Sequence, residues 1–309
     1  MIKSYCANLL NAWDRFWFNQ ADCFVLCVMR ILVGIMLVYT HCVWSKELMT
    51  FFADSGVLAR DYTQALHGNS WFAWSHFYWF QSPTMLWVVH AFAIVIFAMF
   101  TLGIFTRATG ILSFLLVVSY ANRAAGALFG LDQMNAYLTM YLAIAPCGHA
   151  LSVDAWMRTK RGLAPLPQVT TWANVAIRLL QCHLCVIYFF AGTGKLLGPA
   201  WWGGEAIWMS FASYEYQSID MTWMVHYPLV MNAITLSTLL WEVSYAYLVW
   251  PKMTRPIMVG MAILVHAGIG LTMGMITFGY IMIVANVAFI SSALLRKVLR
   301  QPVQPPTSP

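Results

Sequence analysis

The sequence is poor in charged residues: Asp, Glu, Lys and Arg make up only 9% of its 309 residues, while 61% are apolar. Soluble domains carry about a quarter charged residues, so a soluble core in so short a chain is excluded. Lipid is the solvent that accepts this much apolar surface. We expect a single transmembrane domain at residues 22–296, an interfacial or cytoplasmic segment at 1–21 and a disordered cytoplasmic tail at 297–309.

Several kinds of motif are also missing. The sequence contains no phosphate-cradling glycine loop, no His-Glu-x-x-His pattern and no serine nucleophile elbow. The net charge of +6 is spread along the chain without a basic face, so a nucleic-acid partner is not expected. Cys182 and Cys185 have no second ligand pair, which makes a metal or redox role the less favoured interpretation. A cleavable signal peptide is not expected, because the first apolar run is too long.

Apolar runs dominate what is present. A helical span needs about 20 residues, and every span should be helical because lipid offers the backbone no partner. Eight runs are near this length: 22–43, 83–104, 107–123, 132–147, 173–195, 228–250, 256–274 and 277–295. The fourth is short and polar in places, so it either spans or re-enters. The sequence therefore predicts an all-α polytopic membrane protein with about eight transmembrane helices.

The basic residues predict an orientation. With the N-terminus in the cytoplasm, the inside segments hold Lys3, Arg15, Arg107, Arg158, Lys160, Arg161, Lys252, Arg255, Arg296, Lys297 and Arg300. The outside segments hold Lys46, Arg60, Arg123 and Lys195. This asymmetry agrees with the positive-inside rule and places both termini in the cytoplasm. The outer loops 44–82 and 196–227 are rich in Trp and Tyr, which favours interfacial helices there.

Polar side chains inside spans are candidate functional residues, because burying them in lipid is costly. The predicted spans contain Arg30, Arg178, His183, Glu242, His266 and Asn286. The structural alternative is an ion pair of Arg30 or Arg178 with Glu242. A similar pair of Arg123 with Asp132 would hold the turn between the third and fourth runs.

Lys195 is the sharpest single feature. At 100° per residue, Gln181, Tyr188 and Lys195 fall within about 40° of one helix face. A lysine in a dry cavity loses its charge readily, and the neutral amine accepts a proton. The alternative is a lysine that reaches the interface and offsets the negative end of a helix.

A second cluster, Ala145–Trp156, follows the fourth run and contains His149. An imidazole beside an apolar span can donate or accept a proton near neutral pH. The alternative is an ordinary interfacial histidine, with Ser152 capping a short helix.

Together these clusters resemble the membrane domain of the vitamin K-dependent γ-carboxylase family, the horizontally transferred transmembrane domain. Tyr188–Leu196 is similar to the stretch with the family's catalytic lysine, and Gly148–Asp154 to the stretch with its active-site histidine. Phe52–Leu58, Trp241-Glu242 and 266–278 resemble bacterial members, which implies a bacterial inner membrane.

The resemblance implies a mechanism. A base deprotonates a reduced naphthoquinone of the menaquinone or vitamin K type, and reaction with dioxygen then yields a strong base that takes a proton from a glutamate side chain before carbon dioxide adds. Such chemistry needs a dry site near lipid. Lys195 and His149 are the catalytic residues that the resemblance implies, the histidine bonding the quinone oxygen. We predict Tyr188, Gln181, Asn135 and His266 as cofactor-binding residues.

The sequence departs from the animal enzymes in two respects. Gly194 stands where the animal pattern has a second lysine, and we expect no large extramembrane region after the last span. Our topology also puts His149 at the cytoplasmic end of the fourth run and Lys195 at the outer end of the fifth. Three functions remain open: a carboxylase-like or quinone-linked enzyme, a non-catalytic membrane partner or maturation factor for another protein or peptide, and a transporter.

Overall fold

The computed structural model describes residues 2–68, 70–80 and 82–302, except for the side chains of residues 2–4. Its regular secondary structure is helical apart from two short strands, which confirms the predicted all-α class. The strands β1 (Ala21–Asp22) and β2 (Val169–Thr170) pair antiparallel. The chain forms two compact units, a first unit of residues 1–178 and 291–309 and a second unit of residues 179–290.

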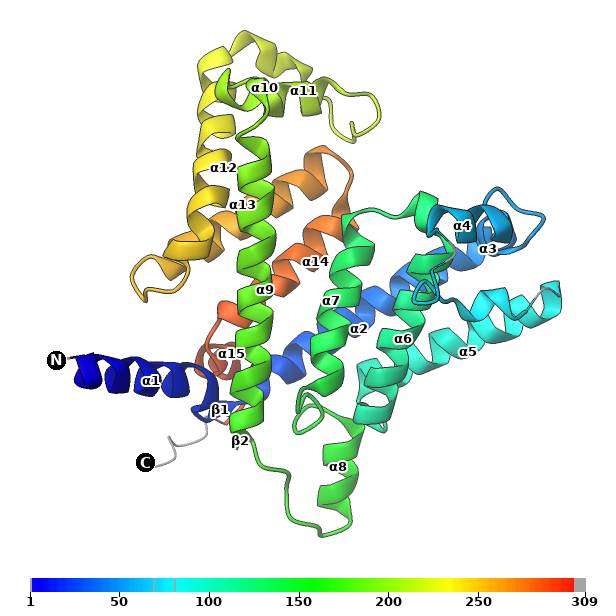
Figure 1. Cartoon of the computed structure of the whole chain (residues 1–309), viewed down its shortest axis with the longest axis vertical. Helices are drawn as coiled ribbons and strands as arrows, with labels where there is room; N and C mark the ends of the chain where they lie inside the picture. The colour runs from blue at the N-terminus through cyan, green and yellow to red at the C-terminus, as the bar shows by residue number, and fades with distance from the viewer. Residues whose placement is uncertain (1, 69, 81, 303–309) are drawn as a thin grey trace. The chain divides into compact units, whose positions relative to one another are not determined.

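The first unit contains most of the helices (Figure 1). Its α-helices are α1 (Ile2–Phe18), α2 (Phe24–Trp44), α3 (Leu48–Phe52), α4 (Arg60–Leu66), α5 (Pro83–Leu102), α6 (Thr106–Arg123), α7 (Gly130–Ile144), α8 (Val153–Lys160) and α15 (Ser292–Val298). Its 3₁₀ helices are η1 (Ser45–Glu47), η2 (His76–Tyr78) and η3 (Ala125–Ala127).

Helix α9 (Thr171–Lys195) begins in the first unit and ends in the second. The other elements of the second unit are α10 (Pro199–Trp202), α11 (Ala206–Ala212), η4 (Thr222–His226), α12 (Pro228–Leu248), α13 (Arg255–Thr272), α14 (Ile276–Asn286) and η5 (Val287–Phe289). The outer loops 44–82 and 196–227 therefore do contain short helices, and their place at the membrane interface stays a prediction.

Four stretches of the described chain are long and apolar enough to cross a membrane. They are Phe24–Phe52, Pro83–Leu102, Thr171–Lys195 and Arg255–Thr272, and a fifth is added if Ile276–Phe289 and Ser292–Val298 count as one broken span. The remaining predicted runs also form helices, but these fall short of the required length or apolar content; α7, for example, has 15 residues. Length and composition thus support four to five crossings, and a total of about eight is not confirmed.

Local sequence signals explain where α5 begins and ends. The Ser82 hydroxyl accepts the backbone N–H of Met85 at 3.2 Å, and Pro83 occupies the first turn. The helix stops at Gly103, whose φ of 71° lies in the left-handed region. Glycine adopts this conformation without a steric penalty, so α5 ends before the next helix starts.

Arg30 is completely buried in α2, yet its partners are carbonyl groups rather than a carboxylate. Its guanidinium donates to the backbone oxygen of Cys147 at 2.6 Å and to that of Leu151. These bonds tie α2 to the segment that connects α7 with α8. Carbonyl dipoles thus hold both terminal nitrogens of this guanidinium without an acid, while its buried Nε has no partner among the described residues.

Arg123 is also fully buried, and the predicted pair with Asp132 is wrong. Its guanidinium donates to the carbonyls of Leu58, Phe52 and Ala53 at 2.6, 2.9 and 3.2 Å. The Asp132 carboxylate instead accepts a backbone N–H at the start of α7. Both groups are satisfied by nearby backbone, so neither needs the other.

A cluster of histidines surrounds Tyr120 in the first unit, and the sequence patterns did not single it out. The Tyr120 hydroxyl lies 2.6 Å from Nδ1 of His90, and Ser119 Oγ lies 2.6 Å from Nδ1 of His76. The rings of His41 and Tyr120 are 4.4 Å apart. Burial lowers the pKa of His76, in the loop before α5, to about 4.

This burial predicts a pH-dependent stability. The unfolded imidazole has a pKa of about 6.5, so between about pH 4 and 6.5 the unfolded state binds more protons than the folded one. The stabilisation is complete above this window and is lost as the pH falls through it. We expect the melting temperature in detergent to fall less between pH 7.5 and 5 for His76→Asn than for the wild type. His226→Asn, in an exposed position, should behave as the wild type.

Candidate functional site

Lys195, the last residue of α9, forms an ion pair with Glu242 of α12. Nζ and Oε2 are 2.6 Å apart, and the side chains are 26% and 9% exposed. The ammonium also lies 5.3 Å from the ring centroid of Trp201, within range of a cation–π interaction. The predicted pairing of Glu242 with Arg30 or Arg178 is therefore wrong, because the lysine holds the carboxylate.

Arg178 is satisfied within the first unit. Its Nε donates to the carbonyl of Phe16 at 3.2 Å, and its guanidinium lies 4.5 Å from the ring centroid of the same residue. The arginine therefore attaches α9 to the end of α1.

A glycine brings α9 close to α12, beside which it runs in the second unit (Figure 1). A Cβ atom on Gly192 would lie 2.9 Å from the backbone nitrogen of Val243 and 3.1 Å from the carbonyl carbon of Glu242. A Cβ atom on Gly194 would meet nothing within 4 Å. Gly192 thus permits the approach at which Lys195, one turn further along, reaches Glu242.

Below this pair, a chain of hydrogen bonds links four buried side chains. Asn286 Nδ2 donates to the carbonyl of Met282 at 2.9 Å, which fixes the orientation of its amide. The same nitrogen donates to the Tyr188 hydroxyl at 3.0 Å, and Asn286 Oδ1 accepts from the Tyr245 hydroxyl at 2.5 Å. The Tyr188 hydroxyl, which lies 2.8 Å from His266 Nε2, is thereby free to donate its own proton to that nitrogen.

The direction of this chain determines the tautomer of a neutral His266. Since Nε2 accepts from Tyr188, the ring proton resides on Nδ1. This Nδ1 is buried and has no hydrogen-bond partner among the described residues. The ring centroid of Trp241 lies 6.2 Å from that of His266 and 5.0 Å from that of Tyr188. A buried N–H donor beside aromatic rings is thus left without an acceptor.

Gln181 and Asn135 were predicted with Tyr188 and His266 as cofactor-binding residues. Gln181 Nε2 donates to the carbonyl of Ala288 at 2.8 Å in the second unit. Asn135 lies in α7 of the first unit, where its buried Oδ1 has no partner among the residues described. The structure therefore brings Gln181, Tyr188 and His266 into one unit and places Asn135 in the other.

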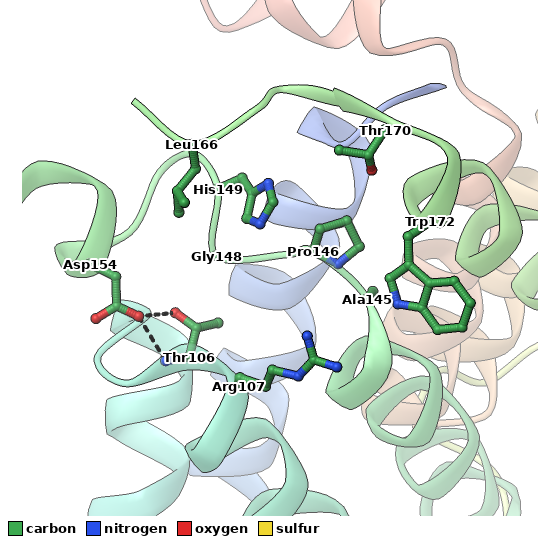
Figure 2. Close-up of a pocket in the computed structure, with 10 residues that line it drawn as sticks. All are labelled: Thr106, Arg107, Ala145, Pro146, Gly148, His149, Asp154, Leu166, Thr170 and Trp172. Atoms are coloured by element: carbon green, nitrogen blue, oxygen red, sulfur yellow. Dashed lines mark hydrogen bonds between the residues drawn. The ribbon is translucent and has the colours of Figure 1, made fainter. Parts of the chain in front are cut away.

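His149 lies in a pocket of the first unit (Figure 2). Its Nδ1 is 2.7 Å from the carbonyl of Pro167, which can only accept, so Nδ1 carries the proton. Ser152 accepts the backbone N–H of Ala155 at 3.0 Å and caps α8, as the sequence predicted. His149 is thus bonded to the segment that precedes α9, whereas Lys195 is the last residue of α9.

The family model of the HTTM domain matches residues 18–293. The chain belongs to the HTTM domain family. This is the domain shared with the membrane region of vitamin K-dependent γ-carboxylase, which confirms the resemblance drawn from the motifs. No curated protein and no solved structure matches the chain significantly.

The HTTM motif around Lys195 contains two glycines with different roles. Gly192 is required where the helices meet, whereas the open space at Gly194 accepts a larger side chain. Tyr245 completes the hydrogen-bonded chain and was missed from the sequence, although it lies about one turn from Trp241-Glu242. Aromatic residues are common in apolar helices, so this spacing alone carried no signal.

The two glycines provide a matched test. Gly192→Ala forces backbone apart where α9 meets α12, so we expect a loss of about 1–3 kcal/mol of stability. Gly194→Ala meets no atom and improves helix propensity, so its stability should be unchanged or slightly higher. Melting temperatures of the purified HTTM chain in detergent measure both. Equal effects of the two substitutions would contradict the close approach.

Proposed function

We propose that this HTTM chain is a membrane enzyme that acts on a reduced, lipid-soluble naphthoquinone, with Lys195 and Glu242 receiving the proton. The observation that carries the proposal is the Lys195–Glu242 ion pair in the same unit as the unsatisfied His266 donor. Membership of the HTTM family and the Tyr188–Leu196 motif support it.

One buried donor of the second unit suits a quinone oxygen. Nδ1 of His266 is a buried donor without a partner among the described residues, and a quinone oxygen is an acceptor. The rings of Trp241 and Tyr188 lie beside this imidazole and make its surroundings apolar. When bound, the reduced quinone would supply the reducing equivalents for reaction with dioxygen.

The chain's own residues orient the ligand and take up the proton. The sequence suggested that Lys195 acts alone as an uncharged amine. Its carboxylate partner keeps the lysine charged, so the group that accepts the proton is the ion pair. The ion pair accepts one proton in total, which leaves an ammonium beside a neutral carboxylic acid. His266, held by Tyr188 and Asn286, keeps its Nδ1 proton directed away from that chain.

The activity test uses the purified protein in lipid nanodiscs with reduced menaquinone and dioxygen. Quinone epoxide formation is measured by chromatography. We expect Lys195→Ala and Glu242→Gln to reduce the rate by about 10²–10⁴-fold, the usual contribution of a general base. Lys46→Ala changes an exposed lysine of the loop 44–82 and should retain the wild-type rate.

Absence of epoxide, or equal rates for the wild type and Lys195→Ala, would reject the proposed function. The resemblance also gives His149 a role toward the quinone, and His149→Gln in the same assay tests that role separately. A rate unchanged by His149→Gln removes the histidine from the reaction and leaves Lys195 to be judged by its own variant.

We also propose about eight spans in a bacterial inner membrane, with both termini in the cytoplasm. The distribution of Lys and Arg between alternate loops supports this topology. It places the two ends of α9 on opposite sides of the bilayer.

Reporter fusions test this topology. Alkaline phosphatase, which is active only outside the cytoplasm, should be active when fused after Leu197 and inactive when fused after Arg161. A fluorescent protein fused at the C-terminus should be bright, as expected in the cytoplasm. Reversed activities at Leu197 and Arg161 would overturn the orientation.

A further inference from the structure

The pocket of the first unit that contains His149 has a volume of about 290 Å³. Four segments form it: the start of α6, the turn after α7, the start of α8 and the stretch that leads into the first turn of α9 (Figure 2). Gly148 lets the turn pack on α6, because a Cβ atom there would lie 2.6 Å from Thr106 Oγ1. The pocket is therefore built by close packing of distant segments.

The single acid that lines this pocket is already satisfied. Asp154 accepts from the backbone N–H of Phe105 at 2.9 Å, from that of Thr106 at 2.8 Å and from Thr106 Oγ1 at 2.7 Å. Its charge thereby compensates the positive start of α6. The backbone N–H groups of Phe105 and Thr106 are consequently not available to another anion.

Arg107 is the cation of the pocket. Among the described residues, its guanidinium has neither a hydrogen bond nor an ion pair. Figure 2 shows the guanidinium between the start of α6 and the turn at Ala145 and Pro146. His149 Nδ1 donates to Pro167, which leaves Nε2 of the neutral ring as an acceptor. The formal charges of Arg107 and Asp154 cancel, but Asp154 is already held by the start of α6, so the Arg107 guanidinium is the charged group of the pocket that lacks a partner among the described residues.

Trp172 lines the pocket and is 47% exposed. Trp172 donates its indole N–H to the carbonyl of Ile144 at 2.5 Å, so the ring is held in place. A fixed tryptophan beside an arginine is typical of a membrane surface, where lipid phosphates lie next to apolar chains.

We propose that this pocket binds a phosphate group through Arg107, with the phosphate of a membrane lipid as its source. The planar guanidinium fork matches phosphate oxygens, and the exposed ring of Trp172 suits the adjoining glycerol and acyl region. The site does not depend on Lys195 or on the proposed reaction.

Binding is measured with the full chain in detergent, by titration with short-chain phosphatidylglycerol, with a short-chain galactosyl diacylglycerol that lacks phosphate, and with inorganic phosphate. We expect saturable binding of phosphatidylglycerol and at least tenfold weaker binding of the galactolipid. Arg107→Gln should weaken phosphatidylglycerol binding at least tenfold, and Arg107→Lys should lie between. Arg161→Gln removes an exposed arginine of the same unit and should stay within twofold of the wild type.

The outcomes separate the sources of phosphate. Binding of phosphatidylglycerol without inorganic phosphate supports a lipid ligand, whereas binding of inorganic phosphate that competes with the lipid supports the phosphate site with a soluble source. Equal binding of the galactolipid, or an affinity unchanged in Arg107→Gln at an unchanged melting temperature, overturns the proposal.

Discussion

The ion pair between Lys195 and Glu242 is the interaction on which the proposed chemistry of this HTTM chain depends. It joins two helices of the second unit at the point where Gly192 lets them approach. A lysine in a membrane protein needs compensation for its charge, and the carboxylate provides it. The same carboxylate also makes the pair, rather than the amine alone, the group that exchanges a proton.

The first unit satisfies its buried charges differently. Arg30 and Arg123 are fully buried, and both donate to backbone carbonyls at the ends of helices and in connecting segments. Their hydrogen bonds hold these segments in place and give donors to carbonyl groups that would otherwise lack them. The Arg107 guanidinium differs from both, since it has no hydrogen bond or ion pair to any described residue. One buried N–H remains without a partner among the described residues on His266 Nδ1 and on Arg30 Nε.

Particular elements show how far the sequence could predict the structure. The run 83–104 became α5 nearly to the residue, because Ser82, Pro83 and Gly103 are strong local signals for the two ends of a helix. Ser152 was likewise identified as a cap from its neighbours in the chain. The run 132–147 gave only the shorter α7, whose first turn the Asp132 carboxylate caps. Charge pairing was predicted least well, since complementary residue types occur at many positions and distance along the chain does not choose between them.

The sequence by itself determined the all-α membrane character, the positions of most long helices and the family, because composition, periodicity and short motifs are local properties. Only the tertiary structure decided which groups meet. Tyr188 bonds to His266 across 78 residues and to Asn286 across 98 residues of chain. These contacts, the tautomer of His266 that follows from them and the choice of Lys195 as the partner of Glu242 depend on how the helices pack. Packing follows from the shapes of all the side chains together, and no single stretch of sequence contains that information.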